Sequence, residues 1–274
     1  MTSLHPLDKA LALESVTPGQ YRGHTSPGYW NMVGPYGGAT AATALRAVLL
    51  HPQLLGEPLS LTVNFAAALT AGPFTVQAEP VRTNRSTQHW SVSILQTDAQ
   101  GQPVVTTTAT AVTAVRRDTW SLGDAPMPAV PPPAQCPRIA LRTGVEWLNR
   151  YEMRPVTGTL PEQWDGQGDS SLSQLWMRDE PTRTLDFCAL AALADVFFPR
   201  VWLRRAVRVP AGTVSLTVYF HANSAELAAT GSGYLLGQAR GQEFRNGFFD
   251  QAAQLWNEAG AMLATSHQIV YFKE

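Results

Sequence analysis

The sequence predicts an α+β fold built from two similar units, because one strand and the elements around it occur twice. Residues 60–65 read Ser-Leu-Thr-Val-Asn-Phe, and residues 215–220, which lie 155 positions later (215 − 60), read Ser-Leu-Thr-Val-Tyr-Phe. Apolar residues alternate in both copies, which is the period of a strand with one face on a core. The shared order of helix, strand, turn and strand favours a duplicated unit over chance similarity.

The elements of each unit follow from local patterns. Apolar runs of small residues predict helices at 39–50 and 185–198, one ahead of each repeated strand. Alternation and Thr/Val enrichment predict strands at 61–65, 74–78, 90–94 and 104–115 in the first half. In the second half we expect strands around 145–156, at 215–221 and at 264–272. One long helix over antiparallel strands is an α+β unit.

Prolines divide the chain. Residues 121–137 contain six of them, which predicts a stiff extended connector rather than a folded element. We therefore expect a first unit at 1–120, a linker at 121–137 and a second unit at 138–274. Both units have an ordinary domain size.

Composition excludes several functions. A formal net charge of −1 gives no electrostatic footprint for nucleic acid or an anionic membrane. No signal peptide and no run of about 18 apolar residues is found, so we expect a soluble, cytoplasmic protein. Cys136 and Cys188 have neither metal-ligand nor C-x-x-C spacing, so we expect inert thiols and no metal site.

Asp195 is the candidate catalytic residue in the second predicted helix. It is the one carboxylate between Phe187 and Phe198, in an apolar helix expected to be buried. Burial and the nearby helix C-terminus both disfavour its charge, which indicates a compensating role. It is either a general base for water or a structural acid, partly exposed or paired with Arg204 or Arg205.

Two polar residues on predicted strands could complete a site with Asp195. Thr213 lies just ahead of the repeated strand, and Gln268 lies in the apolar terminal strand, where its amide needs hydrogen-bond partners. His267 points to the opposite face of a regular strand. No nucleophile elbow, H-E-x-x-H motif or phosphate loop is present.

Gly37 and Gly38 are the candidate substrate-binding residues. They stand at the entry to the first helix, where glycine allows close backbone approach and the first amides have no partner within the helix. Such amides could bind a carbonyl oxygen or an oxyanion. The alternative is that the glycines only let the helix pack closely on a curved sheet.

Motifs along the chain resemble those of the acyl-CoA thioesterase II family, whose members are two fused hotdog domains. The resemblance runs from about Gly34 to Phe272. Its motifs, read in order, are Gly-Pro-Tyr-Gly-Gly at 34–38, residues 60–65, Arg-Thr-Asn-Arg-Ser at 82–86, Tyr-Glu-Met-Arg-Pro-Val at 151–156, Leu-Trp-Met-Arg at 175–178, Ala-Asp at 194–195, Phe-His at 220–221 and residues 264–268. Each motif is weak alone, but their order and spacing together are fairly specific.

The resemblance implies a tandem hotdog that hydrolyses a fatty acyl-CoA to free acid and CoA without a cofactor, and that associates into homo-oligomers. The family's aspartate, threonine or serine, and glutamine fall on Asp195, Thr213 and Gln268. In this interpretation Asp195 and Gln268 activate a water, Thr213 assists, and helix-start amides polarise the thioester carbonyl. Arg46 (195 − 149) and Ala109 (268 − 159) stand at the matching first-half positions, so we expect one working site per chain.

The sequence also departs from the family pattern, which keeps alternatives open. The departures are Ser215 in place of an acid, Ala222-Asn223 in place of Arg-Pro, and Ile269-Val270 in place of an acid and a glycine. One alternative is a non-catalytic acyl-CoA-binding or acyl-binding protein. The other is a hotdog hydratase or dehydratase, which requires an Asp-x-Asn-x-x-His arrangement that the sequence lacks.

Overall fold

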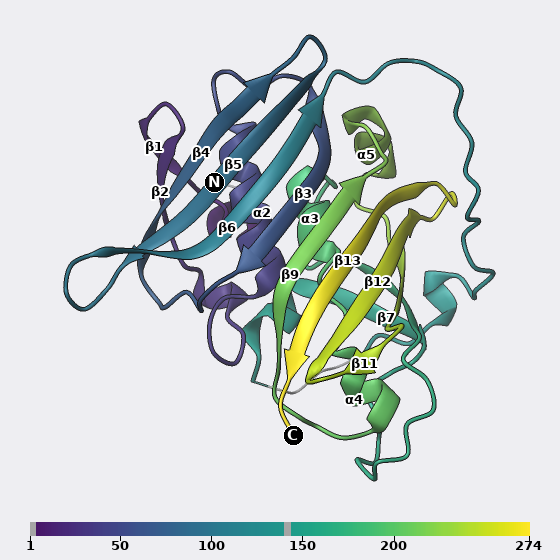
Figure 1. Ribbon diagram of the computed structural model, residues 1–274. Coiled ribbons are helices and arrows are strands. Elements are labelled where there is room, and N and C mark those ends of the chain that lie inside the picture. Colours follow the sequence, from purple (N-terminus) through teal and green to yellow (C-terminus); the bar gives the residue numbers. More distant parts are fainter. Residues whose placement is uncertain (1–3, 140–143) are drawn as a thin grey trace.

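The computed structural model describes residues 4–139 and 144–274, whose strands form one 13-stranded antiparallel sheet (Figure 1). The strands lie side by side in the order β1-β2-β4-β5-β6-β3-β9-β13-β12-β10-β8-β7, and β11 pairs with β12. The strand bounds are β1 Glu14–Thr17, β2 Gln20–His24, β3 Glu57–Phe65, β4 Pro73–Thr83, β5 Thr87–Thr97, β6 Pro103–Ala114, β7 Tyr151–Thr157, β8 Ser173–Asp179, β9 Ala211–Phe220, β10 Leu235–Arg240, β11 Phe244–Arg245, β12 Phe248–Asn257 and β13 Met262–Phe272. The helices are α1 Pro6–Ala10, α2 Gly37–Leu49, α3 Phe187–Leu193, α4 Arg200–Arg205 and α5 Ser224–Thr230, with 3-10 turns η1 Pro27–Tyr29, η2 Pro133–Gln135 and η3 Glu146–Arg150.

The two repeated strands, β3 and β9, join the halves of the sheet. They pair antiparallel, with Leu61 opposite Val218 and Val63 opposite Leu216. Thr62 stands opposite Thr217, and their hydroxyl oxygens are 3.0 Å apart. These two threonines are 155 residues apart, which is also the offset of the repeat. Equivalent residues therefore face each other across a local two-fold axis, as two fused hotdog units require.

One long helix, α2, and one shorter helix, α3, pack together on one face of the sheet (Figure 1). The prediction of α2 is confirmed, although it begins at Gly37. The predicted end of the second helix is wrong: α3 stops at Leu193, and Asp195 lies in the turn that follows. The amide of Asp195 bonds to the carbonyl of Ala192, three residues back, which tightens the chain into a turn.

The proline-rich connector lies against the outer face of the second half. The Trp176 indole donates to the carbonyl of Pro131 at 2.8 Å, and Cys136 is buried with Trp176, Tyr234 and Trp256. The connector is extended, as predicted; much of it loops away from the sheet (Figure 1), and it contacts the second half at separate points such as Ala125 and Pro131. The strand expected from residue 145 begins only at Tyr151, because η3 occupies the preceding residues.

Candidate active site

Asp195 lies where the end of α3 meets the start of α2. Its Oδ1 accepts a 2.8 Å hydrogen bond from Nε2 of Gln268, and the carboxylate also accepts the backbone amide of Gly38. A Cβ on Gly37 would lie 2.8 Å from Oδ2, so only glycine allows this approach without rearrangement. The carboxylate of one half therefore sits on the positive end of the other half's helix.

Burial raises the pKa of Asp195 to about 7, and the hydrogen bonds from Gln268 and Gly38 act in the opposite direction. Asp195 as a whole residue is half-buried. A carboxyl with this pKa exchanges its proton readily at neutral pH, as a general base must. The alternative pairing with Arg204 or Arg205 is wrong, because Arg204 donates to the Gly168 carbonyl and Arg205 pairs with Glu274.

Gln268 and Thr213 are brought together with Asp195, as predicted. Gln268 is 4 % exposed on the inner face of β13, and its Oε1 accepts from the Thr213 hydroxyl at 3.3 Å. The glutamine therefore donates to Asp195 at one end and accepts from Thr213 at the other. His267 points to the outer face, where it lies 3.3 Å from Asp250.

A β-bulge turns Thr213 toward this site. Leu216 pairs with Gln268 and Ser215 with Ile269, but Val270 pairs with Thr213 because Val214 is skipped. Without the extra residue, Thr213 would fall on the outer face. Bulges commonly redirect a side chain in this way beside functional sites.

The start of α2 differs from the expectation of free amides. The Gly38 amide donates a hydrogen bond to Asp195, and the amides of Ala39 and Thr40 donate to the carbonyl of Tyr36. The acceptor oxygen predicted for this helix start is thus supplied by the protein's own carboxylate. Direct substrate binding by Gly37 and Gly38 stays a prediction.

Tyr36 is a site-forming residue that sequence reasoning missed. Its hydroxyl donates to the Ala192 carbonyl at 2.7 Å, and its ring stacks on Trp147 at 4.2 Å between centroids. It therefore ties the start of α2 to the end of α3 beside Asp195. Its place between Pro35 and Gly37, in the motif whose glycines predict a helix start, is the signal in the sequence.

The first half has no matching polar set. In the paired registers, Leu61 stands opposite Ala111 as Leu216 stands opposite Gln268. Ala111, rather than the predicted Ala109, is therefore the counterpart of Gln268. A bulge at the matching place in β3 sets Pro58 where β9 has Thr213.

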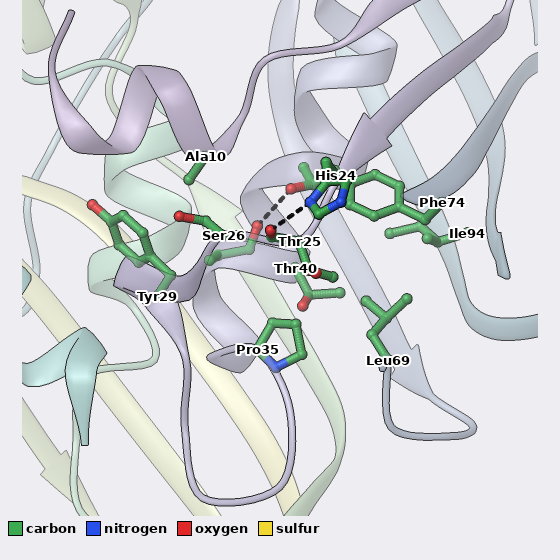
Figure 2. Close-up of a pocket in the computed structure, with 12 residues that line it drawn as sticks. Ala10, His24, Thr25, Ser26, Tyr29, Pro35, Thr40, Leu69, Phe74 and Ile94 are labelled. Carbon is green, nitrogen blue, oxygen red and sulfur yellow. Dashed lines mark hydrogen bonds between the residues drawn. The ribbon is translucent and has the colours of Figure 1, made fainter. Parts of the chain in front are cut away.

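Two small cavities flank the meeting point of the helices. One of about 20 Å³ lies between the start of α2 and the first-half sheet, and Figure 2 shows Pro35 and Thr40 on one side with Leu69, Phe74 and Ile94 nearby. The other, also about 20 Å³, has an apolar lining that includes Val196, Phe197 and Phe198, the residues directly after Asp195. Each has room for about one water, so neither is an open acyl tunnel.

Two domain models of one protein family match the two halves of this chain. The model of the acyl-CoA thioesterase N-terminal domain matches residues 26–114, and that of the acyl-CoA thioesterase C-terminal domain matches residues 124–272. This chain belongs to the acyl-CoA thioesterase family. Like other members of that family, it is a thioester hydrolase.

Solved structures share the fold of this thioesterase. A hotdog protein of unknown function from Alicyclobacillus acidocaldarius is 45 % identical, with 99 % of each chain covered and a TM-score of 0.93. A putative thioesterase II from Thermobifida fusca is 20 % identical, with 100 % of each chain covered and a TM-score of 0.82. The acyl-CoA thioesterase II TesB2 from Mycobacterium marinum is 19 % identical, covering 97 % of this chain and 98 % of its own, with a TM-score of 0.77. No curated protein sequence matches this thioesterase.

Residues 4–139 and 144–274 offer neither a membrane-spanning helix nor a cluster of metal ligands. No helix in this part of the thioesterase has the length and apolar character needed to cross a membrane. No three His, Cys, Asp or Glu side chains gather there in a way that could hold a metal ion.

Proposed function

We propose that the thioesterase hydrolyses an acyl-CoA to free acid and CoA with a water activated by Asp195. The observation that carries this proposal is the buried carboxylate of Asp195, with a pKa of about 7, held between the Gln268 amide and the Gly38 backbone amide. The name of the matching family supports CoA as the thiol carrier.

In the proposed reaction, Asp195 removes a proton from water while the water oxygen attacks the thioester carbonyl carbon. The tetrahedral intermediate then collapses, the C–S bond breaks, and Asp195 returns the proton to the departing sulfur. Gln268 fixes the carboxylate through its 2.8 Å bond, and Thr213 fixes the glutamine amide in turn. This network positions the base without any covalent intermediate.

The acyl chain would enter the apolar region after Asp195. Val196 and Phe197 are buried there beside Met153 and Leu175, and all four line the second small cavity. An apolar acyl chain gains by burial against such side chains, but these must move apart to admit it. Phe197 and Phe198 lie two and three residues after the proposed base and line this cavity, so they are placed to determine the accepted chain length.

Two of the residues that depart from the family pattern, Ser215 and Ile269, lie away from this site. Ser215 and Ile269 pair with each other on the outer face of the sheet, where Ile269 is 43 % exposed. They cannot contact a substrate held on the inner face beside Gln268. This placement favours hydrolysis over a purely acyl-binding role.

Thiol release from acyl-CoAs of graded chain length tests the proposal. We expect the wild type to release thiol and Asp195→Asn to lose at least about 100-fold in kcat, because a positioned general base contributes 10²–10⁴-fold. Asp179→Asn is the matched control, because burial also raises the pKa of Asp179 to about 7 but no contact joins it to Gln268. We expect that control to retain activity.

Two outcomes would contradict the proposal. Full turnover by Asp195→Asn would exclude this carboxylate as the base. Stoichiometric acyl-CoA binding by the wild type without thiol release would support the acyl-binding alternative instead.

A further inference from the structure

Gln251 is a second glutamine on the inner face of the sheet, directly beside Gln268. It lies on β12 and pairs with Gln268 on β13, so the two side chains emerge on the same face about 5 Å apart at Cβ. Its side chain is 2 % exposed. A buried amide next to the proposed site calls for a partner.

Within residues 4–139 and 144–274, no group hydrogen-bonds to the Gln251 side chain. The side-chain amide atoms of Gln251 are not completely sealed from solvent, so a group the size of a water molecule can touch them. Gln88 shows the contrast: it is 1 % exposed, and its amide bonds to Leu55, Gln53 and Thr83. A structural buried glutamine in this protein is thus fully paired, whereas Gln251 is not.

The counterpart of Gln251 in the first half is Trp90. Ala111 pairs with Trp90 on β5 as Gln268 pairs with Gln251 on β12. Trp90 is 1 % exposed, and its indole donates to the Thr113 hydroxyl at 3.1 Å. The first half therefore fills and satisfies this position, while the second half places a smaller side chain there with its amide unpaired.

Gln268 and Gly38 both donate hydrogen bonds to Asp195, whereas the Gly37 amide stays a predicted donor to the substrate. One N–H of Gln268 Nε2 and the backbone N–H of Gly38 each donate to that carboxylate, so these two hydrogens are not available to the substrate carbonyl. Negative charge develops on that oxygen as water adds, and a preorganised donor stabilises it strongly.

We propose that the side-chain amide of Gln251 donates a hydrogen bond to the thioester carbonyl oxygen. As the water oxygen bonds to carbon, the carbonyl π electrons move onto this oxygen, and the amide stabilises the charge without transferring a proton. The proposal rests on the proposed thioester hydrolysis and adds the electrophilic half of the site.

Kinetics of Gln251→Met, with Gln251→Leu as a second apolar variant, test this role. We expect kcat to fall about 100-fold, as for loss of one oxyanion donor, with KM changed by less than about threefold. Thermal midpoints should stay near wild type because no hydrogen bond is lost. Gln88→Met is the matched control: it should lower the thermal midpoint and leave kcat unchanged.

Infrared spectroscopy of a bound, non-hydrolysable analogue tests the hydrogen bond from Gln251 independently of turnover. The probe is an acyl-CoA analogue with CH₂ in place of sulfur and a ¹³C-labelled carbonyl, observed by infrared difference spectroscopy. We expect the carbonyl frequency to be lowered when the analogue is bound to the wild type or Asp195→Asn, and to return toward its free value in Gln251→Met. Equal frequencies in wild type and Gln251→Met, or an unchanged kcat, would overturn the role of Gln251. A failure of the analogue to bind the wild type would overturn this inference and the proposed function together.

Discussion

The two halves share their elements but differ in how the central helix of each, α2 or α3, begins. Asp186 is the N-cap of α3, and its side chain accepts from the amide of Ala189 at 2.8 Å. Tyr36 is the N-cap of α2 and makes no such side-chain bond. The uncapped start of α2 receives the carboxylate of Asp195 from the other half. The first half therefore supplies part of the site although Asp195, Thr213 and Gln268 all belong to the second half.

The halves also differ in the side chains at equivalent positions. By sequence offset, the exposed Arg46 is the first-half equivalent of Asp195. By strand register, Ala111 is the equivalent of Gln268, and Pro58 is the equivalent of Thr213. Each exchange removes a group that can accept or orient a proton. A conserved framework can thus carry chemistry on one side only.

The largest expected effect comes from making the second half like the first at the Gln268 position. Gln268→Ala removes the amide that fixes Asp195 at 2.8 Å, and we expect kcat/KM for an acyl-CoA to fall on the order of 100-fold. Gln254→Ala, a glutamine that pairs with Thr265 outside the site, is the control and should keep its activity. Equal losses in both variants would indicate general damage to the sheet.

The pH dependence of catalysis tests the second difference, the ionisable group. Asp195 must be ionised to act as a base, and burial raises its pKa to about 7. We therefore expect kcat/KM to rise about tenfold per pH unit below this value and to level off above it. Because the Gln268 bond lowers the pKa, the residual activity of Gln268→Ala should reach half its plateau at a higher pH. A flat profile between pH 5 and 8 would argue against Asp195 as the base.

A smaller effect is expected at Thr213. Thr213→Val removes one 3.3 Å hydrogen bond to Gln268, and a neutral bond of this kind contributes about 1 kcal/mol, so kcat should fall roughly fivefold. Thr213→Ser keeps the hydroxyl and should restore most of the rate. A loss in the serine variant as large as in the valine variant would show that the methyl group, not the hydroxyl, matters.

The smallest effect is expected in the first half. Arg46→Gln changes an exposed side chain on α2, so steady-state kinetics should stay within about twofold of wild type and stability within about 0.5 kcal/mol. A marked loss of activity would mean that the first-half position contributes to catalysis after all, contrary to one working site per chain.

Much of the framework could be predicted from the sequence because its signals are local. Alternation in residues 60–65 and 215–220 gives both central strands, and the lone carboxylate in an apolar segment points to Asp195. The contacts of the site depend instead on pairing and packing. The bulge at Val214 reverses the face of Thr213, and simple alternation from Leu216 gives the wrong side. The bond between Gly38 and Asp195 joins residues of different halves, which no local pattern specifies.

The facing pair Thr62 and Thr217 has a consequence for how the halves could diverge. Because β3 and β9 are nearly identical, β3 could pair in the same register with β3 of another molecule, and β9 with β9 of another molecule. The connector makes the mixed pairing intramolecular, at an effective concentration on the order of millimolar for a tether of suitable length. Each half then pairs with the other half of the same chain, so a substitution in one half does not occur on both sides of the β3–β9 junction. With both copies in one chain, a substitution in one half leaves the other half unchanged, so one half can hold a helix start and the other the carboxylate bound to it.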